Sequence, residues 1–75
     1  MLRREPLASA KAARVYKTLL RIGWHRISQS GSHIKLKHRD ATFPDYIWGF
    51  HDRVEIEPKM LARIAKHTGL EPSDL

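Results

Sequence analysis

The sequence predicts a small α+β domain in which two helices pack on a three-stranded antiparallel sheet, in the order helix, strand, strand, strand, helix. Two segments near the ends of the chain repeat their apolar residues at spacings of three and four, as amphipathic helices do. Between them, one segment alternates apolar and polar residues and follows a Ser-Gly-Ser turn signal. A chain of 75 residues forms one domain at most, with a thin core.

The first helix is predicted from Ser9 to Ile22, after a flexible basic lead-in of residues 1–8, so the domain is expected to span residues 9–75. Ser9 is a candidate N-cap, and Gly23 stands where a left-handed residue ends a helix. Basic residues fill the face opposite the apolar stripe. The stripe consists of Ala12, Val15, Tyr16, Leu19, Leu20 and Ile22.

The sheet is predicted from strands at 24–29 and 33–39, joined by a hairpin turn at residues 30–32. We expect the helices to cover the face that carries Ile27, Ile34 and Leu36. Residues 41–50 are aromatic and β-branched and predict the third strand, in which Pro44 marks an end, an edge or a bulge. The polar face of the second strand carries His33, Lys35, Lys37 and Arg39.

The second helix is predicted to begin at Pro58, because proline suits the first turn of a helix, and to stop at Gly69. A turn at 51–53 and a short extended piece at 54–57 precede it, and residues 70–75 are expected to form one last turn. Its apolar stripe consists of Met60, Leu61, Ile64, Ala65 and Thr68.

Composition narrows the function classes. Fourteen Lys and Arg against eight Asp and Glu give a net charge of +6, which favours a polyanionic partner such as nucleic acid, although many basic domains have no such partner. The absence of cysteine excludes disulfides, a thiolate zinc finger and a cysteine nucleophile. We expect no cofactor, no metal site and no membrane span, and a cytoplasmic location because the first residues lack a signal-peptide core.

His33 is the candidate catalytic residue. RNA carries its own nucleophile, the 2′-OH, so its cleavage needs a proton acceptor, a proton donor and a cation for the transition state. Histidine suits the proton transfers, and the preceding Gly31 would let a phosphate approach the backbone. From the pattern alone, an ordinary exposed histidine on an amphipathic strand remains the simpler interpretation.

Lys35, Lys37 and Arg39 form a cationic stripe with steps close to the phosphate spacing of a single strand, which favours backbone contacts with RNA over a merely solvated face. His51 is a candidate second proton-transfer group or a plain loop histidine. His38 is expected on the face opposite His33. The aromatic residues are expected mostly in the core rather than stacked on bases.

The segments 19–24 and 29–33, the latter reading Gln-Ser-Gly-Ser-His, resemble the start of the HicA (YcfA-like) family of toxins, and 58–70 is similar to the closing helix of that family. The resemblance covers about residues 9 to 75 and implies the fold of double-stranded-RNA-binding domains. It also implies an endoribonuclease that cleaves mRNA as the toxin of a toxin–antitoxin pair, with an acidic HicB-type antitoxin as partner.

The resemblance places the catalytic histidine at His33. We expect further RNA contacts at Gly31 and Ser32, in the turn that precedes it. Family members commonly carry a compact Val-Pro-X-His segment, whereas here residues 45–50 separate Pro44 from His51. Two other hypotheses stay open: a non-catalytic RNA-binding module with the same basic face, and a small domain that binds an acidic protein.

Overall fold

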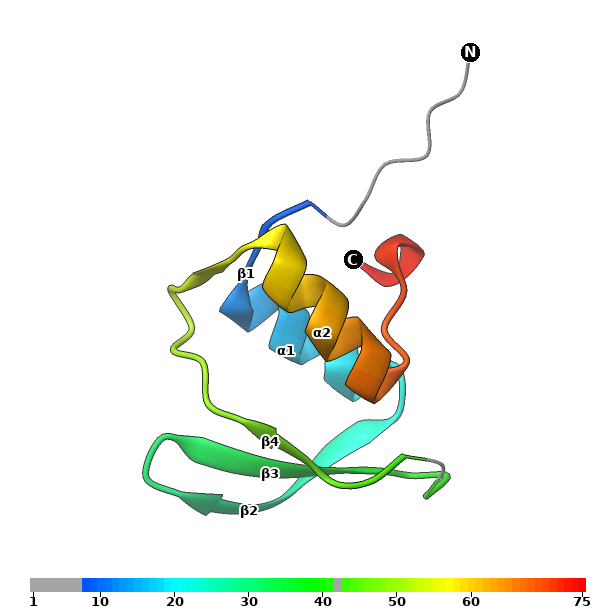
Figure 1. Ribbon diagram of the computed structural model, residues 1–75. Coiled ribbons are helices and arrows are strands. Elements are labelled where there is room, and N and C mark those ends of the chain that lie inside the picture. Colours follow the sequence, from blue (N-terminus) through cyan, green and yellow to red (C-terminus); the bar gives the residue numbers. More distant parts are fainter. Residues whose placement is uncertain (1–7, 42) are drawn as a thin grey trace.

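The computed structural model describes residues 8–41 and 43–75 (Figure 1). It confirms the predicted α+β class with two helices and a three-stranded antiparallel sheet, and adds a two-stranded sheet. Residues 1–7, most of the predicted lead-in, lie outside the described residues. In chain order the elements are β1 (Ala10–Lys11), α1 (Ala12–Arg21), β2 (Trp24–Ser30), β3 (His33–His38), β4 (Tyr46–Trp48), β5 (Glu55–Ile56), α2 (Pro58–Thr68) and a 3₁₀ turn (Pro72–Asp74).

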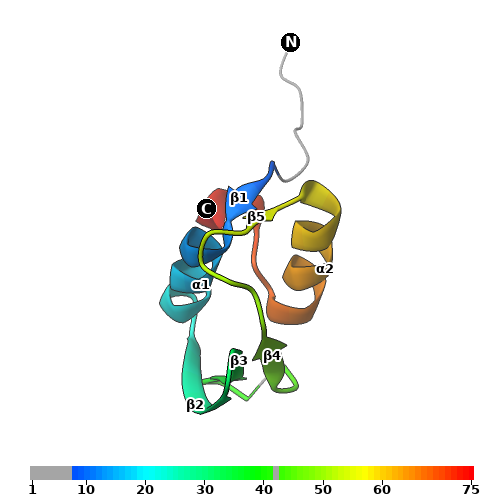
Figure 2. The same cartoon turned by 90° about the vertical axis from the view of Figure 1, so that its left-hand side faces the viewer.

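The three-stranded sheet has the order β2-β3-β4, with both neighbours antiparallel to the central β3. Figures 1 and 2 show α1 and α2 side by side over one face of this sheet. No described helix covers the other face, which we call the open face. The side chains of directly paired residues on neighbouring strands lie on the same face of the sheet. By this rule, the open face carries the side chains of His25, Ser28, Ser30, His33, Lys35, Lys37 and Ile47.

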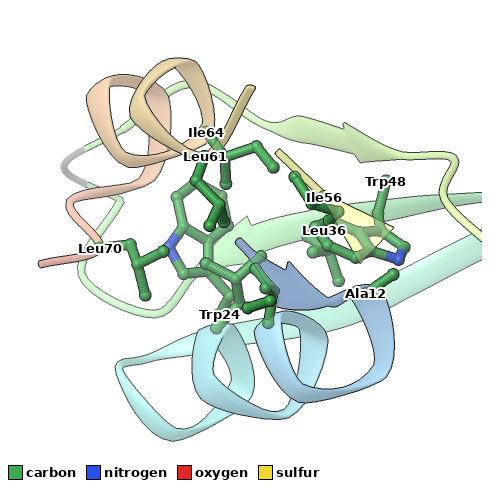
Figure 3. Close-up of a cluster of buried hydrophobic side chains, with 11 residues drawn as sticks. Ala12, Trp24, Leu36, Trp48, Ile56, Leu61, Ile64 and Leu70 are labelled. Carbon is green, nitrogen blue, oxygen red and sulfur yellow. The ribbon is translucent and has the colours of Figure 1, made fainter. Parts of the chain in front are cut away.

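The core lies between the helices and the sheet (Figure 3). Leu19 of α1 and Leu61 of α2 are fully buried, as the helical periodicity predicts. The sheet contributes the two largest buried side chains, Trp24 and Trp48, together with Leu36. Two tryptophans and a few aliphatic residues therefore supply most of the buried apolar surface, which is small in a domain of this size.

The prediction that Ile27 faces the helices is wrong. Arg26 pairs with Leu36 and Ser28 pairs with Lys35, so a β-bulge at Ile27 leaves it without a partner. The extra residue shifts the alternation of β2, and the Ile27 side chain is 45% exposed. Alternation along a strand predicts which sheet face each side chain occupies only where no bulge interrupts the pairing.

The predicted start of the first helix is also wrong. The chain before α1 forms β1, in which Ala10 pairs with Ile56, and the helix begins only after Lys11. Ser9 therefore does not cap it, and no side chain does. The extended piece predicted at 54–57 is present as β5, and its pairing with β1 holds the starts of the two helices together.

The prediction for one residue of the apolar stripe of the first helix is wrong. Leu20 is 41% exposed, whereas Thr18 is buried and donates from Oγ1 to the carbonyl oxygen of Arg14 at 2.9 Å. A threonine buries its methyl group on a helix because the helix carbonyl satisfies its hydroxyl. The end of α1 agrees with the sequence, since Gly23 has a φ of 117°.

The predicted third strand at 41–50 is shortened to β4, residues Tyr46–Trp48. Ala41 has a φ of 54°, which is incompatible with an extended strand, and Pro44 has no N–H for a ladder. The turn predicted at 51–53 is present, with residues 52 and 53 in turn conformation.

The second helix begins at Pro58 and ends before Gly69, whose φ is 79°, as predicted. Leu61, Ile64 and Thr68 of its stripe are buried, and the last turn is the 3₁₀ segment. Within residues 8–41 and 43–75, neither helix has the length and apolar character needed to cross a membrane.

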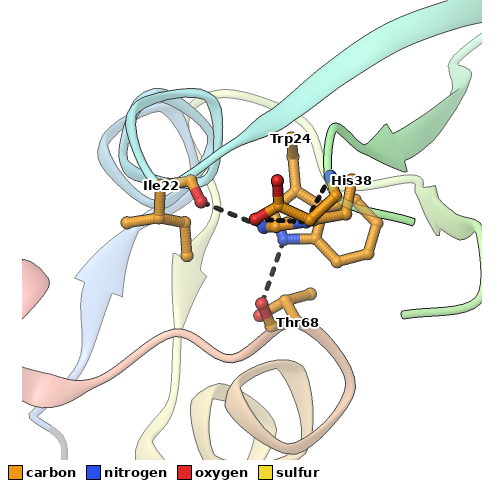
Figure 4. Close-up of polar contacts among 5 residues, drawn as sticks. Ile22, Trp24, His38 and Thr68 are labelled. Atoms are coloured by element: carbon orange, nitrogen blue, oxygen red, sulfur yellow. Dashed lines mark hydrogen bonds and ion pairs between the residues drawn. The ribbon is translucent and has the colours of Figure 1, made fainter. Parts of the chain in front are cut away.

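His38 ends β3 on the helix side, opposite His33 as predicted, and is buried. Its Nδ1 accepts the N–H of Asp40 at 3.2 Å, so its Nε2 carries the proton and donates to the carbonyl oxygen of Ile22 at 3.1 Å (Figure 4). The rings of His38 and Trp24 pack in a T-shaped arrangement with their centroids 5.3 Å apart. These contacts give His38 a structural role at the junction of α1 and β2.

Candidate functional site

The candidate site begins at the β2–β3 turn. Gly31 has a φ of 61°, a conformation that glycine adopts without strain, and a Cβ built at this position would have no neighbour within 4 Å. Ser32 completes the turn, and His33 begins β3 opposite Ser30. Gly31, Ser32 and His33 are all exposed, so the turn leaves the backbone and the imidazole accessible to a ligand.

Two side chains of β2 brace this turn. Arg26 donates to Oε1 of Gln29 at 2.9 Å, and Nε2 of Gln29 donates to the carbonyl oxygen of Gly31 at 3.0 Å. The chain of hydrogen bonds fixes the turn that carries His33. Sequence reasoning missed both residues, because an arginine and a glutamine three positions apart on a strand carry no motif.

His33 lies on the open face, with its imidazole against the backbone of Gly49. Ile34 of β3 pairs with Trp48, the last residue of β4, and Gly49 follows directly. A Cβ on Gly49 would lie 3.0 Å from Cδ2 and 3.3 Å from Nε2 of His33. The ring is thus exposed to solvent but packed along one edge.

Lys35 and Lys37 share the open face with His33, as the alternation predicts. Both ammonium groups pair with Asp45, at 4.0 Å from Lys35 and 3.5 Å from Lys37. The sequence did not indicate this carboxylate, which reaches the stripe only because the chain between β3 and β4 folds back. All three side chains are substantially exposed, so each pair contributes at most about 1 kcal/mol and a phosphate can compete for the lysines.

Arg39 is not part of the strand. β3 ends at His38, and Arg39 lies in the following turn, where its N–H donates to the carbonyl oxygen of Gly23 at 2.9 Å. The predicted regular spacing of three cations along one strand therefore holds for Lys35 and Lys37 but not for Arg39. The exposed Arg39 side chain adds charge near the end of the stripe.

His51 lies in the loop between β4 and β5, exposed, with its carbonyl oxygen accepting the N–H of Val54 at 3.0 Å. In the described parts of the chain, no hydrogen bond joins the side chains of His51 and His33. His51 follows Gly49 by two residues, which keeps it on the segment that contacts His33.

The aromatic residues serve mainly the core, as predicted. Trp24 and Trp48 are each 2% exposed, and the half-buried Tyr16 and Phe50 pack against Trp48. Tyr46 is half-buried as well, and this burial raises the pKa of its hydroxyl. Ile47 is a large apolar side chain on the open face; it is 51% exposed and pairs with Lys35.

A groove of about 700 Å³ lies away from this face, along α1 and the C-terminal turn. None of the predicted site residues lines it. Its cationic lining residues are Lys11, Arg14, Lys17 and Arg21. Over residues 8–41 and 43–75, no group of three or more His, Asp or Glu side chains is arranged to hold a metal ion. The candidate chemistry therefore lies on an open, basic surface, which suits a polymeric substrate better than a small enclosed one.

In a comparison with protein families, residues 12–70 match the model described as the HicA toxin of bacterial toxin–antitoxin systems. This range contains both helices and all strands except β1. Comparison with curated proteins and with solved structures gives no match.

Proposed function

Since the chain belongs to the HicA toxin family of bacterial toxin–antitoxin systems, whose members are generally ribonucleases, we propose that it is an endoribonuclease that cleaves mRNA with His33 as its catalytic residue. The observation that supports this role is the placement of His33. The residue is exposed, follows a tight turn and shares an open sheet face with Lys35 and Lys37.

The proposed reaction is an internal transphosphorylation. His33 accepts the proton of a ribose 2′-OH, the 2′ oxygen forms a bond to the adjacent phosphorus, and the bond from phosphorus to the 5′ oxygen breaks. The departing 5′ oxygen takes up a proton, so the products are a 2′,3′-cyclic phosphate and a 5′-hydroxyl. His51 is the candidate donor for that proton.

The lysines stabilise the extra negative charge of the transition state. Lys35 lies two residues from His33 on the same face, and Lys37 follows at the same interval. An approaching phosphate displaces Asp45 from them, which costs little because the ion pairs are exposed. Gly31, Ser32 and Arg39 offer further contacts to the RNA backbone on either side.

The proposed protein partner is an acidic antitoxin of the HicB type that covers the open face. Its carboxylates would compete with RNA phosphates for Lys35 and Lys37, in the way that Asp45 already occupies them. Because mRNA and the antitoxin are both cytoplasmic, the proposed location of the activity is the cytoplasm.

The test is His33→Ala, compared with the parent and with His67→Ala as a matched control. His67 is an exposed histidine on α2, so its loss removes a ring without touching the open face. In a time course on labelled RNA, His33→Ala should lower the cleavage rate about 10²- to 10⁴-fold, as the removal of a general base does. His67→Ala should cleave like the parent, and cleavage should persist in EDTA.

Circular dichroism should show all three proteins folded, because His33 is exposed and supplies no core volume. Full activity of folded His33→Ala would overturn the mechanism. A folded parent that binds RNA tightly but cleaves no RNA would favour the non-catalytic binding module instead.

A further inference from the structure

The backbone conformation of Gly49 does not require a glycine, in contrast to that of the other three glycines. Gly23, Gly31 and Gly69 all have positive φ angles, of 117°, 61° and 79°, where a side chain is strained. Gly49 has no positive φ, lies just after β4 and is exposed. Glycine weakens a strand end relative to residues with side chains, so its presence here calls for another reason.

The space beside Gly49 supplies that reason. The heavy atoms within 4 Å of a Cβ built on Gly49 are Cδ2 and Nε2 of His33, at 3.0 and 3.3 Å. Apart from the chain neighbours Trp48 and Phe50, no backbone atom and no other side chain of the described residues lies within 4 Å of that Cβ. The single group that a methyl at this position would push is therefore the imidazole.

We propose that Gly49 is a positioning residue for His33: its missing side chain leaves the place that the imidazole edge occupies, so the segment that follows β4 sets the orientation of a ring carried by β3. This inference rests on the proposed function of His33. A ring held along its Cδ2–Nε2 edge samples fewer orientations than a free surface histidine. The nitrogen that accepts the proton is therefore already oriented before RNA binds.

An added methyl displaces the ring without harming the fold. A contact of 3.0 Å is tighter than most real Cβ contacts, and the ring can relieve it by moving a few tenths of an ångström. Because the backbone of Gly49 is not left-handed, Gly49→Ala should leave the melting temperature unchanged or raise it. Loss of activity together with retained stability is the signature of a positioning role.

The experiment measures cleavage by the parent, Gly49→Ala and Gly49→Val. We expect kcat to fall about 10- to 100-fold in Gly49→Ala and further in Gly49→Val, as small misplacements of a catalytic group do, with KM for RNA unchanged. Gly69→Ala is the matched control, because its Cβ would meet the ring of Phe43 at 2.8 Å and not the imidazole of His33. It should lower the melting temperature and leave kcat unchanged.

The geometry has a test of its own. In the parent, a nuclear Overhauser effect should join the Hδ2 proton of His33 to the Hα protons of Gly49, and in Gly49→Ala the His33 ring signals should shift. An unchanged kcat in Gly49→Ala, or a raised KM with unchanged kcat, would overturn the inference while leaving His33 catalytic. A parent that cleaves no RNA would remove the proposed function, and absence of the Overhauser effect would separately remove the inference.

Discussion

The indole nitrogen of Trp24 donates a hydrogen bond to the backbone carbonyl oxygen of Thr68 across 3.0 Å, joining the first residue of β2 to the last residue of α2 (Figure 4). Trp24 is 2% exposed, so this bond is shielded from water. The carbonyl is one of those that a helix end leaves without an intrahelical partner. A single side chain thus packs the core and anchors the second helix to the sheet.

Trp24→Phe should reduce the free energy of unfolding by about 1 to 3 kcal/mol, because it leaves the Thr68 carbonyl buried without a donor. Urea denaturation followed by circular dichroism measures the change. Tyr16→Phe is the control, since the Tyr16 hydroxyl makes no hydrogen bond within the described residues. An equally small effect of both substitutions would mean that the bond contributes nothing.

Leu19→Ala and Leu61→Ala should each reduce the free energy of unfolding by about 2 to 5 kcal/mol, since both side chains are fully buried. That loss threatens a domain whose total stability is of the same order. Leu20→Ala, on the same helix as Leu19 but 41% exposed, should cost at most about 0.5 kcal/mol. Thermal melts of the three variants check the assignment of the buried helix faces, and similar melting temperatures for all would contradict it.

Changing Lys35 and Lys37 together to Ala should weaken RNA binding for all sequences. The slope of log K against log salt should fall by roughly 0.7 for each phosphate that the variant no longer neutralises. Asp45→Asn should act in the opposite direction, because it frees both lysines from their carboxylate. Fluorescence anisotropy at several salt concentrations measures both. An unchanged slope in the lysine variant would place the RNA elsewhere, such as on the groove along α1.

Stability should fall at alkaline pH through Tyr46. Burial raises the pKa of its hydroxyl above 10.0, so the folded chain holds this proton at pH values where the unfolded chain releases it. Below about pH 10 the residue is protonated in both states and contributes no pH dependence. Above that pH, ionisation favours the unfolded chain.

Tyr46→Phe should therefore lose less stability than the parent between pH values below and above about 10. Urea denaturation at both pH values gives the comparison. A parallel loss in parent and variant would show that the burial of Tyr46 has no energetic consequence.

The sequence by itself determined the two helices, the hairpin and the side of β3 on which His33 lies. These features depend on local rules: the spacing of Leu19 and Leu61 in their helices, the glycine turn at residues 30–32 and the alternation of β3. The family resemblance rests on the same local segments, and the match over residues 12–70 confirms it.

The tertiary structure alone decided what approaches the site. Asp45 reaches the lysines through a loop, Gly49 meets His33 across a strand pair, and the bulge turns Ile27 outward. Each of these depends on contacts between residues distant in the chain or on one inserted residue in a ladder, and neither leaves a periodic signal in the sequence. The pairing of β1 with β5, which displaced the expected helix cap at Ser9, has the same non-local cause.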